Sequence, residues 1–191
     1  EAIDSVLQQP NQSLEVIVVD DGSSDNTSAV SSYYKKSHDN IQYIYQRNQG
    51  PSAARNSGIA ASHGKYIVFL DADDRMKKSF LTKCLRVMQQ NPSVSFVYTQ
   101  MEYFGRESKI SEFTDYNLDM LKCDNFINAS ALFRRNVFDD LLYDRRLRSG
   151  LEDWDVYLAL ASRGMHGKLL NEPLLLYRKH DAGVVSMTDR M

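Results

Sequence analysis

Short apolar runs recur along the first 100 residues and alternate with segments that have helical spacing. The runs at 14–19 (LEVIVV) and 66–70 (YIVFL) are apolar at nearly every position, which is typical of buried parallel strands. Residues 41–45 alternate apolar and polar side chains, and 94–98 form a further strand-like run. Over 80–88 the apolar side chains instead lie on one face of a helix. This alternation predicts an α/β layer with a mainly parallel sheet flanked by helices.

Helix start signals lie between these strands. Asp25 can cap a helix that runs to about His38, and Pro51 lies at the start of a small-residue helix over 52–62. Residues 2–7 already have helical spacing, with no capping residue before them. We therefore expect the chain to begin inside the fold, with an earlier segment absent from it.

The alternation weakens in the second half of the chain. Residues 105–125 are polar and charged without a clear period, and 126–133 are apolar and expected to be extended. The patterns over 136–143 and 151–163 predict helices, and 174–177 predict a last strand. No Pro/Gly-rich linker divides these segments, so we expect a single domain.

Composition narrows the class of protein. A length of 191 residues suits one ordinary domain, and Lys plus Arg (23) nearly balance Asp plus Glu (25), without the basic excess of a nucleic-acid binder. Hydrophobic residues make up 42%, which argues against wholesale disorder. The sequence has no run of about 18 apolar residues for a membrane span. We expect Cys84 and Cys123 to be reduced thiols, which suits a cytoplasmic location.

Acidic residues follow two of the predicted buried strands, Asp20 and Asp21 after one and Asp71 and Asp73 after another. Ligands of open α/β sheets bind beyond the carboxyl ends of the strands. Neighbouring carboxylates repel one another unless a cation lies among them, and oxygen ligands favour Mg²⁺ or Mn²⁺. Either cluster alone is equally well explained by turns and helix caps, where Asp is common.

Five stretches, in this order, resemble the signatures of family 2 glycosyltransferases with the GT-A fold. They are VIVVDDGSSD at 16–25, NQGPSAARNSG at 48–58, GKYIVFLDADD at 64–74, GLEDWD at 150–155 and YRKH at 177–180. Each stretch is short, but their order and spacing match the family over residues 1 to 186.

The resemblance implies a Rossmann-like α/β fold of the spore-coat polysaccharide synthesis type of nucleotide-diphospho-sugar transferase. This fold has a central mixed, mainly parallel sheet flanked by helices. The domain over 1–191 would have a nucleotide-binding half at 1–100 and an acceptor-binding half at 101–191. The family begins with one more strand, so the first strand is expected to be missing.

The resemblance also implies roles on the donor side. The Asp pair after the second strand of similar enzymes meets the nucleotide base, so Asp21 would recognise uracil with Asp20 in support. Arg55 would offset the charge of the diphosphate, although a surface arginine on a helix is the alternative. Asp71 and Asp73 resemble the DxD motif, in which Asp71 would contact the ribose or the metal's water shell. Asp73 would ligate the metal between the phosphates.

On the acceptor side, Glu152 and Asp153 resemble the family's ED motif. Asp153 would be the general base of an inverting transfer, and Glu152 would orient that carboxylate or the acceptor. An acidic helix N-terminus explains the same pair without catalysis. Trp154 would form an acceptor platform or belong to the core, and His180 would complete the metal site or be structural.

The implied protein is a metal-dependent (Mn or Mg) glycosyltransferase of the hexosyltransferase type. It would move a sugar from a nucleotide donor, a UDP-sugar, to a hydroxyl of a glycan or lipid-linked acceptor in polysaccharide biosynthesis. It would bind no nucleic acid and would act in the cytoplasm, with peripheral association at the inner face of the membrane.

Three alternatives stay open from the sequence. A two-component receiver domain shares acidic residues after early strands, but it leaves Glu152, Asp153 and Trp154 unexplained. A sugar-phosphate nucleotidyltransferase would release pyrophosphate rather than a nucleoside diphosphate. A non-catalytic carbohydrate-binding relative would bind sugar without turnover.

Overall fold

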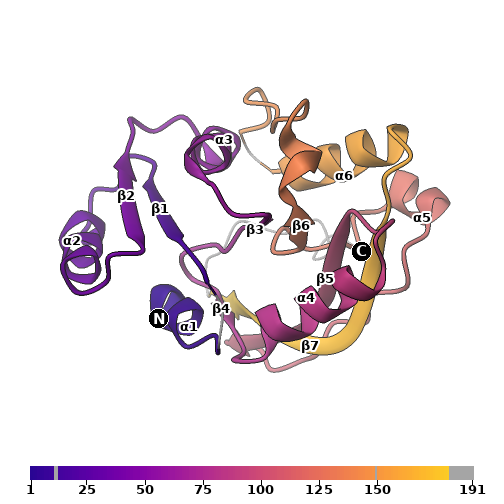
Figure 1. Cartoon of the computed structure of the whole chain (residues 1–191), viewed down its shortest axis with the longest axis horizontal. Coiled ribbons are helices and arrows are strands. Elements are labelled where there is room, and N and C mark those ends of the chain that lie inside the picture. The colour runs from indigo at the N-terminus through magenta and orange to yellow at the C-terminus, as the bar shows by residue number, and fades with distance from the viewer. Residues whose placement is uncertain (11–12, 149, 181–191) are drawn as a thin grey trace.

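The computed structural model describes residues 1–10, 13–148 and 150–180, so the last part of the expected domain, 181–191, lies outside the described residues (Figure 1). The first half contains α1 (Ala2–Leu7), β1 (Val16–Asp20), α2 (Thr27–Ser37), β2 (Ile41–Tyr45), α3 (Pro51–Ala61), β3 (Tyr66–Val68), β4 (Arg75–Met76) and α4 (Phe80–Gln90). The second half contains β5 (Phe96–Gly105), α5 (Leu118–Cys123), β6 (Leu132–Arg134), the 3-10 helix η1 (Arg135–Phe138), α6 (Glu152–Ser162) and β7 (Gly167–Lys179).

The described strands form two sheets. β1 and β2 pair in parallel, from Val16 with Ile41 to Asp20 with Tyr45. The five-stranded sheet has the order β3-β6-β5-β7-β4, in which the long β5–β7 pair is parallel and the other three pairs are antiparallel. The predicted α/β fold with a mixed sheet is confirmed, but the five-stranded sheet is not mainly parallel, because three of its four strand pairs are antiparallel. Its division into two hydrogen-bonded sheets was not foreseen, because apolar runs indicate burial but not which strands pair.

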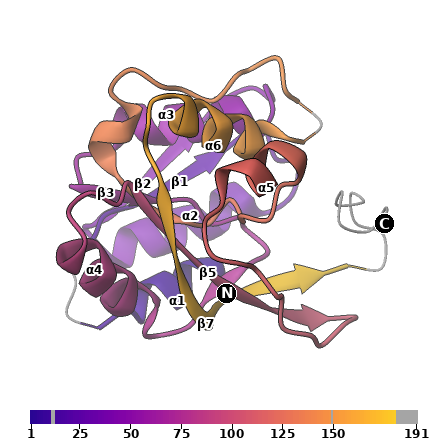
Figure 2. The ribbon, with the colours of Figure 1, turned by 90° about the vertical axis from the view of Figure 1, so that its right-hand side faces the viewer.

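Helices cover both faces of the five-stranded sheet. Phe96, Tyr98 and Phe133 are buried in the cluster that includes α6 and α5, whereas Val97 and Leu132 are buried in the cluster that includes α4. Successive side chains of β5 and β6 therefore face opposite layers, as the period of a strand requires. Figure 2 shows α5 next to α6, and α2 and α3 pack on the β1–β2 pair (Figure 1).

Several segments differ from the sequence-based expectation; β7, for example, begins at Gly167, whereas the last strand was expected over 174–177. β5 continues to Gly105 instead of ending near residue 98, and only η1 is helical within 136–143. Helix α5 lies in the segment 105–125, which showed no helical period. Its start is set by Asn117, whose side-chain oxygen accepts hydrogen bonds from the N–H groups of the first turn. The six residues of α5 lie within a polar and charged segment, where no apolar period stands out.

The longest described helices have 11 residues. Within residues 1–10, 13–148 and 150–180, no helix combines the length and apolar character needed to cross a bilayer.

Candidate active site

Asp20 ends β1 with its carboxylate held by two donors. It is 3% exposed and accepts hydrogen bonds from the Ser23 N–H (2.7 Å) and the Tyr43 hydroxyl (2.7 Å). These two bonds hold the pKa of Asp20 below its ordinary value. The carboxylate therefore stabilises the turn after β1 and its contact with β2.

Asp21 is held by the loop between β2 and α3. Its carboxylate accepts hydrogen bonds from the Gln46 side chain (2.7 Å) and from the N–H groups of Gln49 (2.9 Å) and Gly50 (2.7 Å). Because three protein groups already donate to this carboxylate, only part of its hydrogen-bond accepting capacity is left for a nucleotide base. The neighbouring Gly22, at φ +79°, allows the loop to approach closely, since a Cβ there would lie 2.8 Å from the Asn48 nitrogen. The Asp21 carboxylate therefore stabilises the loop between β2 and α3, and its recognition of uracil stays a prediction.

Arg55 in α3 joins the two acidic motifs. Its guanidinium donates to Glu152 (2.5 Å) and to Asp71 (3.2 Å), and it lies 5.5 Å from the centre of the Tyr143 ring. The side chain is 10% exposed, so the surface-arginine alternative is wrong. Burial opposes the charge of Arg55, but the nearby Asp71 and Glu152 carboxylates outweigh it and raise the pKa of Arg55. The guanidinium therefore stays charged in the site.

Asp71 and Asp73 follow β3, and Asp73 lies beside the end of β7. The Asp73 carboxylate is 2.8 Å from Nε2 of His180, and both side chains are about half exposed. The fold therefore brings together the two residues predicted to ligate the metal. Asp74 instead is buried and accepts a hydrogen bond from the Arg178 N–H (2.9 Å). Burial, with the adjacent Asp71 and Asp73, raises the pKa of Asp74 to about 7.

The Asp73–His180 pair provides one carboxylate and one imidazole, both of which Mn²⁺ accepts as ligands. Within the described residues no group of three or more His, Cys, Asp or Glu side chains is arranged to hold a metal ion. A cation at this pair would take its remaining ligands from phosphate oxygens and water, as ions bound with nucleotides do. The donor set therefore fits a cation that protein and diphosphate hold together.

Glu152 and Asp153 open α6, directly after Leu151 in the left-handed region (φ 72°). The Asp153 carboxylate accepts hydrogen bonds from the Trp154 N–H (2.8 Å) and from the Asn125 amide (3.1 Å). Burial raises the pKa of Asp153, and the Glu152 charge adds to this rise against the opposing hydrogen bonds. A carboxylate with a raised pKa is a stronger proton acceptor once it is ionised.

Trp154 connects α6 to α5. Its indole N–H donates to the Leu121 carbonyl oxygen (2.6 Å), and its ring packs against the core cluster of α6. The side chain therefore has a structural contact, and its use as an acceptor platform stays a prediction.

Sequence reasoning missed Tyr143 and Asn125. The Tyr143 ring is 3% exposed beneath Arg55, and its backbone N–H and C=O both pair with the Asn56 amide at 2.9 Å. The Arg55–Asn56 motif was the one signal that could have pointed to Tyr143, because the Asn56 side chain is what pairs with the Tyr143 backbone. Nothing in the sequence pointed to Asn125, which lies in a segment without a period.

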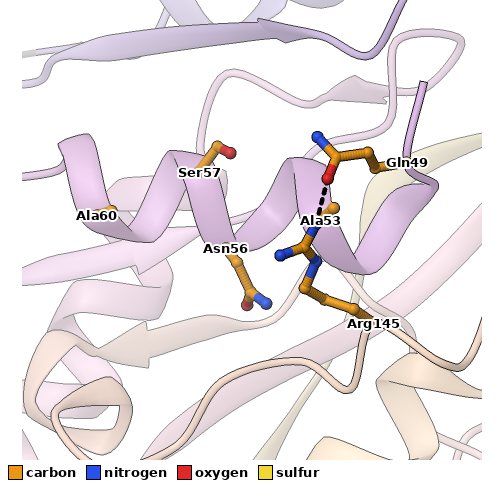
Figure 3. Close-up of a pocket in the computed structure, with 6 residues that line it drawn as sticks. All are labelled: Gln49, Ala53, Asn56, Ser57, Ala60 and Arg145. Carbon is orange, nitrogen blue, oxygen red and sulfur yellow. Dashed lines mark hydrogen bonds between the residues drawn. The ribbon is translucent and has the colours of Figure 1, made fainter. Parts of the chain in front are cut away.

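Two open cavities lie on the described surface near these elements. One, of about 270 Å³, runs along α3, where Arg145 is hydrogen-bonded to Gln49 (Figure 3). The lining residues are Gln49, Ala53, Asn56, Ser57, Ala60 and Arg145. Another, of about 260 Å³, lies in the half expected to bind the acceptor and is lined by Tyr103, Lys109, Ser111, Glu112, Phe113, Asp124 and Phe126.

The fold is that of a GT-A glycosyltransferase domain. The chain belongs to glycosyl transferase family 2, whose family model matches residues 1–142. This membership places the domain among the transferases, and it decides against the receiver and nucleotidyltransferase alternatives.

Known proteins agree with this assignment. A Rickettsia felis protein described as an uncharacterized glycosyltransferase is 32% identical over 179 residues, 90% of this chain and 29% of that protein. Staphylococcus aureus TarS 1–349 in complex with UDP-GlcNAc superposes with a TM-score of 0.79 at 17% identity, covering 95% of this chain and 55% of that one. The mannosyltransferase PcManGT from Pyrobaculum calidifontis, in complex with GDP-Man and Mn²⁺, superposes with a TM-score of 0.74 at 16% identity, covering 95% and 53%. The two structures confirm the GT-A fold, and the chain spans under a third of the Rickettsia relative.

Proposed function

We propose that this domain catalyses an inverting, metal-dependent transfer of a sugar from a nucleotide sugar to a hydroxyl of a glycan or lipid-linked acceptor. The observation that carries the proposal is the Arg55 network. It places the DxD carboxylate Asp71 and the ED carboxylate Glu152 on one guanidinium, 3.2 and 2.5 Å away. A donor bound at the DxD motif would then lie next to the general base Asp153.

A UDP-sugar is the proposed donor. TarS was solved with UDP-GlcNAc and PcManGT with GDP-Man, so nucleotide sugars are the ligands of both structural relatives. Uracil recognition would fall to Asp21, with Asp20 in support at the end of β1. Since Asp21 already accepts three protein hydrogen bonds, one remaining acceptor direction would receive the N–H of the base.

Asp73 and His180 would hold the divalent cation with the donor diphosphate. When bound, the cation supplies positive charge that stabilises the departing nucleoside diphosphate. Arg55 would add a second, fixed positive charge near Asp71. Its ion pair with Glu152 holds that carboxylate in place, whereas N–H groups alone hold the Asp153 carboxylate in the described structure.

Asp153 would remove the proton of the acceptor hydroxyl. The acceptor oxygen would form a bond to the anomeric carbon on the face opposite the phosphate. The bond from that carbon to the phosphate oxygen breaks, and its electron pair leaves with the nucleoside diphosphate. One displacement inverts the configuration, and burial of Asp153 favours uptake of the proton.

We also propose a cytoplasmic location with peripheral association at the inner face of the membrane, and a role in polysaccharide biosynthesis. The free thiols of Cys84 and Cys123 are consistent with a reducing compartment.

The decisive experiment compares wild type with Asp153→Asn on a panel of nucleotide sugars with Mn²⁺. Donor hydrolysis and sugar transfer are the readouts, and nucleotide binding is measured by calorimetry. We expect the variant to bind UDP as wild type does and to lose turnover by about a hundredfold or more. Wild-type turnover in the variant would refute the base assignment. Donor binding without turnover in wild type would instead favour the non-catalytic alternative.

A further inference from the structure

Asn125 donates its amide N–H to the carboxylate that we assign as general base. It lies two residues beyond the end of α5, and its Nδ2 is 3.1 Å from Oδ2 of Asp153. This contact joins segments that are 28 residues apart in the chain. The preceding residue, Asp124, has extended backbone angles (φ −150°, ψ 144°). Asn125 therefore reaches the base from an irregular segment rather than from the helix that carries the base.

The base is held at both oxygens. The Trp154 N–H donates to Oδ1 at 2.8 Å, and the Asn125 amide donates to Oδ2. Each oxygen keeps a second lone pair, so the carboxylate is oriented and can still accept a proton. The indole N–H of Trp154 bonds the Leu121 carbonyl oxygen at 2.6 Å, which fixes α5 against α6. The segment carrying Asn125 is thereby kept within reach of Asp153.

The N–H side of the Asn125 amide is hydrogen-bonded, whereas its oxygen, in the part of the chain that the structure describes, is not. Asn56, an amide with a structural role, pairs on both sides with the backbone of Tyr143. Asn125 pairs only through its N–H side, and its buried Oδ1 has no hydrogen-bond partner among the described residues. A buried amide oxygen without a partner lowers stability. The described hydrogen bonding of the Asn125 side chain is therefore confined to the Asp153 carboxylate, in spite of this cost in stability.

We propose that Asn125 is a positioning residue that orients Asp153 and favours its ionised form. The proposal rests on the proposed function, since it assumes that Asp153 is the base. A hydrogen bond from a neutral amide stabilises a carboxylate more than a carboxylic acid. Loss of the Asn125 N–H therefore leaves Asp153 protonated up to a higher pH.

Other groups also act on Asp153 and must stay constant in a test. Glu152 precedes it on α6 and Arg55 faces it from α3. The phenols of Tyr143 and Tyr157 lie within electrostatic range, from the loop before α6 and from α6 itself. A substitution at Asn125 leaves all four in the chain.

The test uses Asn125→Ala and Asn125→Leu; leucine is close to asparagine in size, lacks the amide donor and adds no charge beside Asp153. Asn128→Ala is the matched control, because Asn128 also has a buried, unpartnered Oδ1 but donates to the Thr99 carbonyl oxygen (3.1 Å) instead of to the base. Hydrolysis of UDP-GlcNAc with Mn²⁺, in which water is the acceptor, is followed from pH 5 to 9 alongside calorimetric UDP binding. The full chain is used throughout.

We expect both Asn125 variants to lower kcat at pH 7 by about tenfold or more and to move the acidic limb of the kcat profile to higher pH. The UDP Kd and the donor KM stay within about twofold of wild type, and the limb of Asn128→Ala stays in place. An unmoved limb in Asn125→Leu overturns the proposal, as does an equal shift in Asn128→Ala. If Asp153→Asn keeps wild-type turnover, the proposed function fails first, so the two failures are distinguishable.

Discussion

Replacing Arg55 by methionine would remove the cation that joins the two acidic motifs, and we expect it to destabilise the fold. The side chains of Arg55 and Glu152 are 10% and 9% exposed, so their 2.5 Å ion pair is shielded from water. Removing one partner of such a pair costs about 3–5 kcal/mol, because the other charge is left uncompensated. Asp71 contributes little, since its side chain is 53% exposed and exposed pairs are worth about 0–1 kcal/mol.

The expected loss of about 3–5 kcal/mol is a large part of the roughly 5–15 kcal/mol by which a domain is stable. Urea unfolding at pH 7 would measure it for Arg55→Met, Glu152→Gln and the double variant. The double variant should recover at least about 1 kcal/mol relative to Arg55→Met, because glutamine removes the uncompensated carboxylate. A loss below about 1 kcal/mol, or no recovery in the double variant, would refute the reasoning from burial.

Three further predictions follow from other parts of the site. Folding raises the pKa of Asp153, so the folded chain binds more protons at this residue than the unfolded chain does. The contribution of Asp153 to the free energy of unfolding therefore falls as pH rises through the raised pKa. Asp153→Asn should therefore unfold at a higher urea concentration than wild type at pH 8, and a lower midpoint would contradict the burial argument. Asp73→Asn and His180→Gln should each weaken Mn²⁺-dependent UDP binding by about tenfold, measured by calorimetry. Equal weakening in the absence of metal would argue against a cation at this pair. Burial raises the pKa of the Cys84 thiol to about 12, whereas Cys123 is exposed. A thiol reagent should therefore modify only Cys123 in the native protein, and both cysteines after unfolding. Rapid native modification of Cys84 would show that α4 opens more readily than its packing indicates.

The nucleotide-binding half was the more predictable part of the fold. β1, β2 and β3 lie within or close to the apolar runs that predicted them, and α3 begins at Pro51. These elements have local signals, since a buried strand and a small-residue helix are visible within a window of about ten residues. Helix α5 has no such local signal, because its start depends on a single capping residue, Asn117.

The sequence by itself determined which charged residues end the strands and open α6, and through the ordered motifs it determined the family. The tertiary structure decided what each carboxylate contacts. Asp21 is braced by a loop 25 to 29 residues further along, and Glu152 is paired with an arginine 97 residues away. Asp153 is held by Asn125, for which the sequence held no signal. Local patterns record the periods of helices and strands, but hydrogen-bond partners distant in the chain are set only when the layers pack.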